Sequence, residues 1–123
     1  MLVVEIFNHN LNFKTPGGTS RGVLKNKLTW YIKIYYGNKP SVYGLGECGP
    51  IEGLSIESGN KMMNQLKKVQ KSINDLSSLD LSLFPSIQFG IESALRDLKN
   101  GGTRIIFQNS FLEGKPIKIN GLI

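Results

Sequence analysis

The sequence predicts an α+β domain in which a three-stranded antiparallel meander precedes a helical bundle. In the first part of the chain, apolar and polar residues alternate at the two-residue period of a pleated strand. Beyond residue 60, apolar residues recur at steps of three and four, which is the period of an amphipathic helix. Because the strands come first and the helices follow, the sheet is expected to pack beside the helices rather than alternate with them.

The strands are predicted from composition and turn residues. Residues 2–7 are rich in Val, Ile and Phe and form the first strand, which residues 11–14 either continue or pair with. Residues 15–22 hold three glycines and a proline, so we expect a loop there. Residues 28–36 form the clearest strand, and residues 42–46 return beside it after a short turn.

The helices follow a second loop, residues 48–55. Ser55 or Ser58 is expected to cap the first helix, because a serine oxygen can accept an unpaired backbone N–H. One apolar stripe marks that helix: Met62, Leu66, Val69, Ile73 and Leu76. A second stripe follows Pro85, a residue tolerated in a first helical turn: Ile87, Ile91, Ala94, Leu95 and Leu98. Glycines 101 and 102 end this helix, and residues 117–123 have the composition of a strand.

Composition restricts the class of protein. The 123 residues suit one domain, and no apolar run is long enough to cross a membrane. The N-terminus lacks the pattern of a signal peptide, and the one cysteine, Cys48, excludes an intramolecular disulfide, so a cytoplasmic protein is expected. The formal charge is +6, but the lysines are scattered or lie on one helix face, which disfavours a nucleic-acid partner.

The short motifs supply no complete catalytic or metal site. Residues 44–49 match GxGxxG after a strand, but Pro50 follows at once where a dinucleotide site needs a helix. His9 is the one histidine, so neither a Cys/His metal set nor a Cys–His pair is present. The glycine- and proline-containing loops on either side of the hairpin are either binding elements or plain connections.

The order of these segments resembles a known family. Residues 15–22, Trp30, residues 44–47, Pro50 and residues 53–55 are similar to the amino-terminal region of the enolase superfamily, in its muconate-lactonizing group. Residues 85–98, with Ala-Leu-Arg-Asp-Leu, resemble the late helix of the capping domain in that group. The first loop and the ending Ile-Asn-Gly-Leu are most similar to o-succinylbenzoate synthases.

The resemblance implies a capping domain over residues 1–115 and the start of the first strand of a TIM barrel at residues 116–123. The barrel itself is absent from this chain, and in the family it holds both catalytic lysines and the ligands of a magnesium ion. The family's enzymes are lyases of menaquinone biosynthesis that act on a small carboxylate. No catalytic or metal-binding residue is therefore expected here, and the chain alone is expected to be inactive and to self-associate through its exposed end.

The resemblance also implies that residues 15–22 and 48–55 form a lid over the substrate. Thr19, Ser20 and Arg21 would supply hydrogen-bond donors and a positive charge. Ile51 and Leu54 would supply apolar walls. A structural role is expected for Glu47, because it directly follows a strand.

Two alternatives remain open at this point. The cap could belong to a related enzyme of the same group, namely a dipeptide epimerase, an N-succinylamino acid racemase or a cycloisomerase. From a different class, the chain could be a small basic module that binds nucleic acid through tyrosines 31, 35, 36 and 43.

Overall fold

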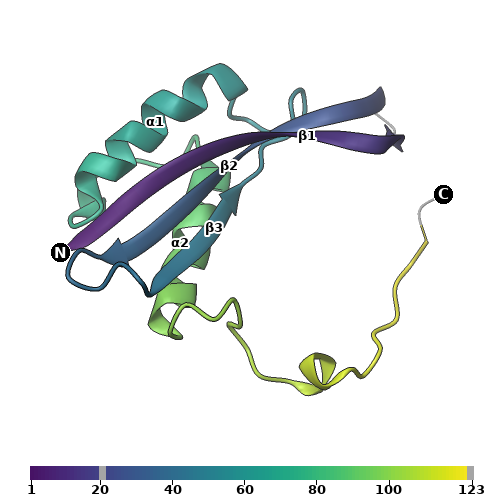
Figure 1. The fold of residues 1–123 in the computed structure, drawn as a ribbon. Helices are drawn as coiled ribbons and strands as arrows, with labels where there is room; N and C mark the ends of the chain where they lie inside the picture. The colour runs from purple at the N-terminus through teal and green to yellow at the C-terminus, as the bar shows by residue number, and fades with distance from the viewer. Residues whose placement is uncertain (20–21, 122–123) are drawn as a thin grey trace.

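The computed structural model describes residues 1–19 and 22–121. An antiparallel sheet in the order β1-β2-β3 confirms the predicted meander, and two α-helices follow it (Figure 1). The elements in chain order are β1 (Leu2–Thr19), β2 (Gly22–Tyr36), β3 (Tyr43–Cys48), α1 (Gly59–Ser72), η1 (Leu76–Ser78), α2 (Pro85–Lys99) and η2 (Ser110–Glu113).

Strands β1 and β2 are longer than the sequence indicated. The prediction of a loop over residues 15–22 was wrong for the described part, because β1 continues to Thr19 and β2 begins at Gly22. The register explains how a proline fits there: Asn12 pairs with Asn26 and Gly17 with Leu24, so four residues of β1 lie opposite one residue of β2. Such a bulge leaves residues unpaired, which removes the need for the N–H that Pro16 lacks.

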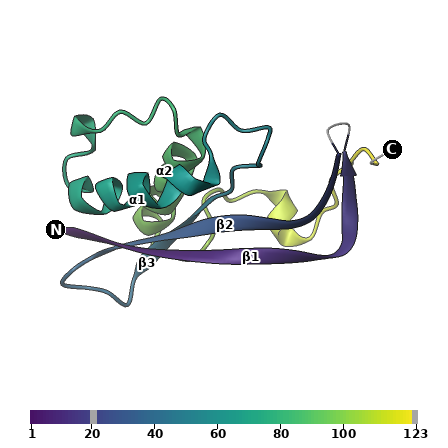
Figure 2. The same ribbon diagram turned by 90° about the horizontal axis from the view of Figure 1, so that it is seen from above.

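Both helices cover the same face of the sheet (Figure 2). In the part of the sheet that they cover, alternate strand residues point toward them, and Val4, Ile32 and Ile34 are buried there. The predicted helical stripes supply the other half of the core: Met62, Leu66 and Val69 from α1, and Ile87, Ile91, Ala94 and Leu98 from α2. Burying each of the larger side chains stabilises the folded state by about 1.5–3 kcal/mol. The predicted first stripe ends beyond its helix, because α1 stops at Ser72 and Leu76 lies in η1.

Glycines of β3 allow α2 to approach the sheet closely. A Cβ added at Gly44 would lie 1.8 Å from the Ala94 carbonyl oxygen, and one added at Gly46 would lie 1.9 Å from that of Gly90. The GxGxxG pattern at residues 44–49 therefore serves helix packing in this fold. No helix starts within the pattern, since β3 runs to Cys48 and α1 begins at Gly59.

The segment after α2 leaves the domain. Gly101 and Gly102 end the helix as predicted, with φ of +87° and +70°. The following residues arc away from the sheet and helices (Figure 1) and expose large apolar side chains, among them Phe107 at 68% and Ile119 at 85%. Residues 117–121 are not a strand, because none of the described residues pairs with them; Leu122 and Ile123 lie outside the described residues.

Candidate functional site

Two segments separated in sequence lie at the same end of the domain. The first, which we call the hairpin arm, comprises residues 8–19 of β1 and 22–29 of β2. It extends beyond β3, whose pairing with β2 begins at Trp30 and Cys48. The second is the loop of residues 49–58 that joins β3 to α1. Figure 2 shows both segments beyond the helical layer, with the end of the arm bending toward the side of the sheet that the helices cover.

The 49–58 loop is held in shape by its own hydrogen bonds. The Ile51 amide donates to Ser55 Oγ at 2.8 Å, and the Ser55 amide donates to the Ile51 carbonyl at 2.8 Å. Ser55 was one of two candidate caps for α1, but its hydroxyl serves this loop instead. Ser58 takes the N-cap position with extended backbone, although its side chain caps no backbone amide and lies 2.6 Å from Asn60 Oδ1.

A buried carboxylate anchors the loop to α2. Glu57 is only 5% exposed, and its Oε2 accepts bonds from the amide and the hydroxyl of Ser86, each at 3.0 Å. Ser86 lies in the first turn of α2, directly after Pro85. A negative charge there satisfies a free helix amide and interacts favourably with the helix dipole. Glu57 therefore fixes where the loop ends, relative to the helix and the sheet.

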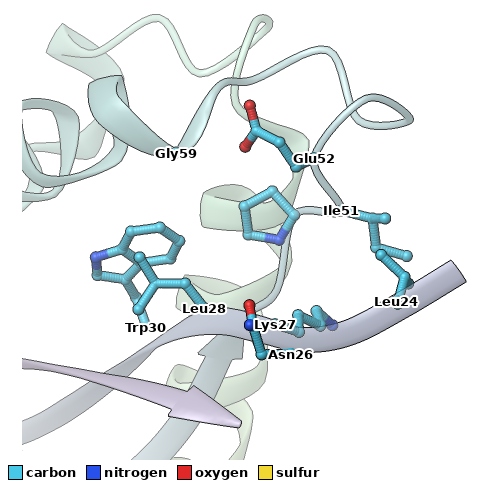
Figure 3. Close-up of a pocket in the computed structure, with 9 residues that line it drawn as sticks. Leu24, Asn26, Lys27, Leu28, Trp30, Ile51, Glu52 and Gly59 are labelled. Carbon is cyan, nitrogen blue, oxygen red and sulfur yellow. The ribbon is translucent and has the colours of Figure 1, made fainter. Parts of the chain in front are cut away.

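A cavity of about 180 Å³ lies between the arm and the loop (Figure 3). Leu24, Leu28 and Trp30 form its wall on β2, and Pro50 and Ile51 face them from the loop. The polar groups at its border come from three further residues: Asn26, Lys27 and Glu52. Apolar walls with a few polar groups are typical of a small-molecule site. The cavity joins the second predicted lid segment, residues 48–55, to the base of the arm, whereas none of the described residues of the first segment lines it.

The structure separates the predicted site residues. Ile51 is half-buried and lines the cavity, whereas Leu54 is 53% exposed and does not line it. Thr19 is the last residue of β1, at the far end of the arm. Ser20 and Arg21 lie outside the described residues.

Most of the cavity wall was missed by sequence reasoning. Leu24 and Asn26 were not singled out, because a loop was expected up to residue 22 and a strand only from residue 28. Leu28 was placed in that strand but not in the site. The signal was present in the sequence, since Leu24, Leu28 and Trp30 continue the two-residue alternation of β2 backwards into the arm.

Glu47 has a partner on the neighbouring strand. Its Oε2 lies 2.7 Å from the hydroxyl of the fully buried Thr29, which also lies 3.1 Å from the Cys48 carbonyl oxygen. This hydroxyl links β2 to the end of β3, where the 49–58 loop begins. The contact supports the structural role expected for Glu47.

The described residues contain no group of three His, Cys, Asp or Glu side chains that could hold a metal ion. Cys48 is fully buried, and burial together with the nearby Glu47 and Glu57 raises the pKa of its thiol to about 12. A protonated, inaccessible thiol is a poor nucleophile. In the part of the chain that the structure covers, no helix is long and apolar enough to span a membrane.

The face of the sheet opposite the helices carries charges of both signs among its tyrosines. Lys33 lies 3.7 Å from the Glu5 carboxylate and 4.4 Å from the ring centroid of Tyr43. A module that binds nucleic acid through stacking requires aromatic side chains on a positively charged surface. Here Glu5 and Glu47 stand beside the tyrosines, so the face is not continuously positive.

Comparison with known proteins gives one family. The model of that family, "MenC, N-terminal domain", matches residues 1–98. A curated relative, o-succinylbenzoate synthase of Desulfotalea psychrophila, is 29% identical over 149 residues, which cover 93% of this chain and 40% of the relative. The chain therefore spans well under half the length of that protein.

Solved structures show the same fold. The crystal structure of MenC from Desulfotalea psychrophila has a TM-score of 0.79 and 24% sequence identity to this chain. The match covers 99% of this chain and 41% of the MenC chain. The o-succinylbenzoate synthase of Thermosynechococcus elongatus, solved with magnesium in its active site, matches 77% of this chain and 29% of its own, with a TM-score of 0.65 and 18% identity.

A further match is an enolase family member from Agrobacterium tumefaciens with homology to dipeptide epimerases, solved with sodium and L-Ala-L-Glu bound. It covers 94% of this chain and 35% of its own, with a TM-score of 0.65 and 18% identity. At these identities the structures show the fold alone, but the family model covers most of the chain. The chain therefore belongs to the MenC N-terminal domain family, which confirms the expected resemblance to the capping domain of o-succinylbenzoate synthases.

Proposed function

We propose that this chain is the capping domain of an o-succinylbenzoate synthase and that it acts as the lid over the substrate. The supporting observation is the convergence of the hairpin arm and the 49–58 loop around one cavity at the end of the domain. A lid contributes to catalysis by excluding water and by fixing the orientation of the substrate.

The proposed lid implies which groups would face a small carboxylate. Ile51, with Leu24 and Leu28 of the arm, would pack against the apolar part of the substrate. The hydroxyls of Thr19 and Ser20 would donate hydrogen bonds, and Arg21 would supply a positive charge. Leu54, on the exposed side of the loop, would close against the surface beneath the lid rather than line the cavity.

The chemical step is assigned to a catalytic barrel that these residues do not contain. Magnesium in such a barrel stabilises negative charge on the substrate, but the described residues offer no ligand set that fits a metal. We therefore propose that the domain alone has no dehydratase activity and no tight magnesium site. The enzyme would work in the cytoplasm, where a free thiol such as Cys48 persists.

Residues 1–115 would form the cap, and residues 116–123 would begin the first barrel strand. The apolar residues after α2 would then pack against the barrel. Ile117 and Ile119, 68% and 85% exposed here, are the clearest examples. Such side chains are expected to draw two copies of the isolated domain together.

A chimera tests the proposal. This chain replaces the matching N-terminal region of the Desulfotalea psychrophila o-succinylbenzoate synthase, whose barrel is retained, and the barrel without any cap serves as the control. We expect the chimera to dehydrate the synthase substrate and the control to be inactive. A chimera that folds, as judged by circular dichroism, but turns over only dipeptides would favour the epimerase alternative. A folded chimera without either activity would contradict the lid.

The role of Arg21 is tested in the same chimera. Arg21→Ala is expected to raise KM more than it lowers kcat, because the charge would contribute to binding rather than to the chemical step. Arg96→Ala, which removes an exposed arginine from α2, is the matched control and should change neither constant. A large loss of kcat at unchanged KM would show that the role of Arg21 is misassigned.

A further inference from the structure

The chain leaves α2 through a turn with an unusual backbone. Gly101, Gly102 and Arg104 all have positive φ, of +87°, +70° and +68°. Glycine adopts this conformation freely, whereas an arginine pays about 1–2 kcal/mol for it. Arg104 is the one non-glycine residue with positive φ in the described chain, so other interactions must hold it there.

A buried carboxylate supplies those interactions. Asp97, in the last turn of α2, is 2% exposed and accepts a bond from the Arg104 backbone amide at 2.8 Å. The Arg104 guanidinium binds the second oxygen of the same carboxylate, which also accepts the Leu45 amide of β3 at 3.0 Å. Hydrogen bonds to a charged group each contribute about 1.5–3 kcal/mol, which is enough to offset the backbone strain.

The guanidinium reaches further than Asp97. Its Nη1 donates to the carbonyl oxygens of Tyr43 and Gly102, both at 3.0 Å, and its carbon lies 4.5 Å from the centroid of the Tyr43 ring. The backbone of Gly102 approaches Tyr43 so closely that a Cβ would lie 2.4 Å from the Tyr43 carbonyl oxygen. One arginine therefore ties the end of α2 and the start of β3 to the departing chain.

One more hydrogen bond holds the departing chain to α2 two residues beyond Arg104. Asn100 Nδ2 donates to the Ile106 carbonyl oxygen at 3.3 Å. Beyond that point, within the described chain, residues 107–121 form hydrogen bonds only among themselves, around η2. The direction in which the chain departs (Figure 1) is thus determined between Asp97 and Ile106.

We propose that Asp97 and Arg104 are positioning residues that form a rigid joint between the cap and whatever follows it. A plain glycine-rich linker would let the following segment swing freely. Here one guanidinium nitrogen, Nη1, reaches Asp97, Gly102 and Tyr43 together, and the planar group lies over the Tyr43 ring. If the proposed function holds, this joint sets the angle at which the lid meets the barrel.

A distance measurement on the 123-residue chain tests the joint without any assumption about function. Spin labels are attached at Lys68→Cys on α1 and Gln108→Cys just beyond the joint, both exposed positions, and the distance distribution is recorded by double electron–electron resonance. Cys48 is fully buried and remains unlabelled. The labelled chain is diluted with unlabelled chain, so that the distances within one copy dominate, and we expect a single narrow distribution.

Three substitutions, two at the joint and one away from it, separate the outcomes. Arg104→Ala is expected to broaden the distribution by about a factor of two or more. Arg104→Lys is expected to broaden it as well, because an ammonium lacks the planar group that lies over the Tyr43 ring. Lys61→Ala removes the same charge from an exposed position on α1 and should leave it narrow. A broad distance distribution in the unsubstituted chain would refute the proposal of a rigid joint. A narrow distribution in Arg104→Ala would refute it as well.

Kinetics in the chimera give a second readout. If the joint orients the lid, Arg104→Ala lowers kcat and raises KM together, as changes at a hinge do. If Arg104 only stabilised the fold, kcat per mole of protein would fall at constant KM. If the unsubstituted chimera is itself inactive, the proposed function is refuted. The distance measurement still tests whether the joint is rigid.

Discussion

Gly46→Ala tests the close contact between β3 and α2 most directly. The added Cβ would lie 1.9 Å from the Gly90 carbonyl oxygen and 2.7 Å from the Gly90 carbonyl carbon. Both are backbone atoms in the middle of α2, so no side-chain rotation can relieve the overlap. An ordinary contact of about 3.4 Å requires the helix to move away by about 1.5 Å, in a core packed as densely as a molecular crystal.

That displacement should be costly. Overpacking a core typically costs 1–3 kcal/mol, and a shift of a whole helix lies at the upper end of this range. It would separate Ile87, Ile91 and Ala94 from Ile32 and Ile34, all of which are at most 3% exposed. We therefore expect Gly46→Ala to lower the free energy of unfolding by about 3 kcal/mol.

Urea unfolding followed by fluorescence measures this loss. Trp30 is the single tryptophan and is 3% exposed, so its emission reports on the core next to β3. With a slope of about 1.5 kcal/mol per M, a loss of about 3 kcal/mol lowers the midpoint by about 2 M. Gly18→Ala is the control, because a Cβ at Gly18 meets nothing within 4 Å. If both variants unfold at the wild-type midpoint, the close contact does not exist.

Three further predictions concern the loop, the thiol and the exposed end. Glu57→Gln keeps the shape of the side chain but removes its charge from the start of α2, so it should lower the free energy of unfolding by about 1–2 kcal/mol and speed hydrogen exchange in residues 49–58. Glu52→Gln, an exposed neighbour, should do neither. Because burial raises the pKa of Cys48 from 9.0 to about 12, the protonated thiol favours the folded state below pH 9, and this contribution should fall as the pH rises from 9 toward 12. Urea midpoints of the wild type and Cys48→Ala across that range should converge if the prediction is correct, and parallel curves would refute it. Light scattering during gel filtration should show self-association of the wild type and a monomer for the double variant Ile117→Lys/Ile119→Lys, whereas a wild-type monomer would contradict the proposed barrel-facing surface.

The short-range part of the fold could be predicted from the sequence. The alternation around Ile32 and Ile34 identified β2, and the stripes through Leu66 and Ile91 identified the two helices, because side-chain burial in strands and helices repeats every two or every three to four residues. The order of strands before helices then indicated an α+β domain. The ordered resemblance pointed to the family.

The candidate site was only partly predictable, since its walls come from segments whose pairing no local pattern specifies. Ile51 was predicted to be a wall residue, but its partners Leu24 and Leu28 depend on a hairpin arm that continues through a proline-containing bulge. Leu54 has the same apolar character as Ile51, and only the turn of the loop places it outside the cavity.

Other features depend on contacts between residues far apart in the chain. Glu57 and Ser86 are 29 residues apart, and Leu45 and Asp97 are 52 residues apart. Sequence alone determined the class of fold, because periodic burial is a local property of strands and helices. Only the tertiary structure decided that Gly46 serves helix packing, that Glu57 anchors a loop and that Arg104 holds a strained turn, because each role requires a partner that the chain brings close only when it folds.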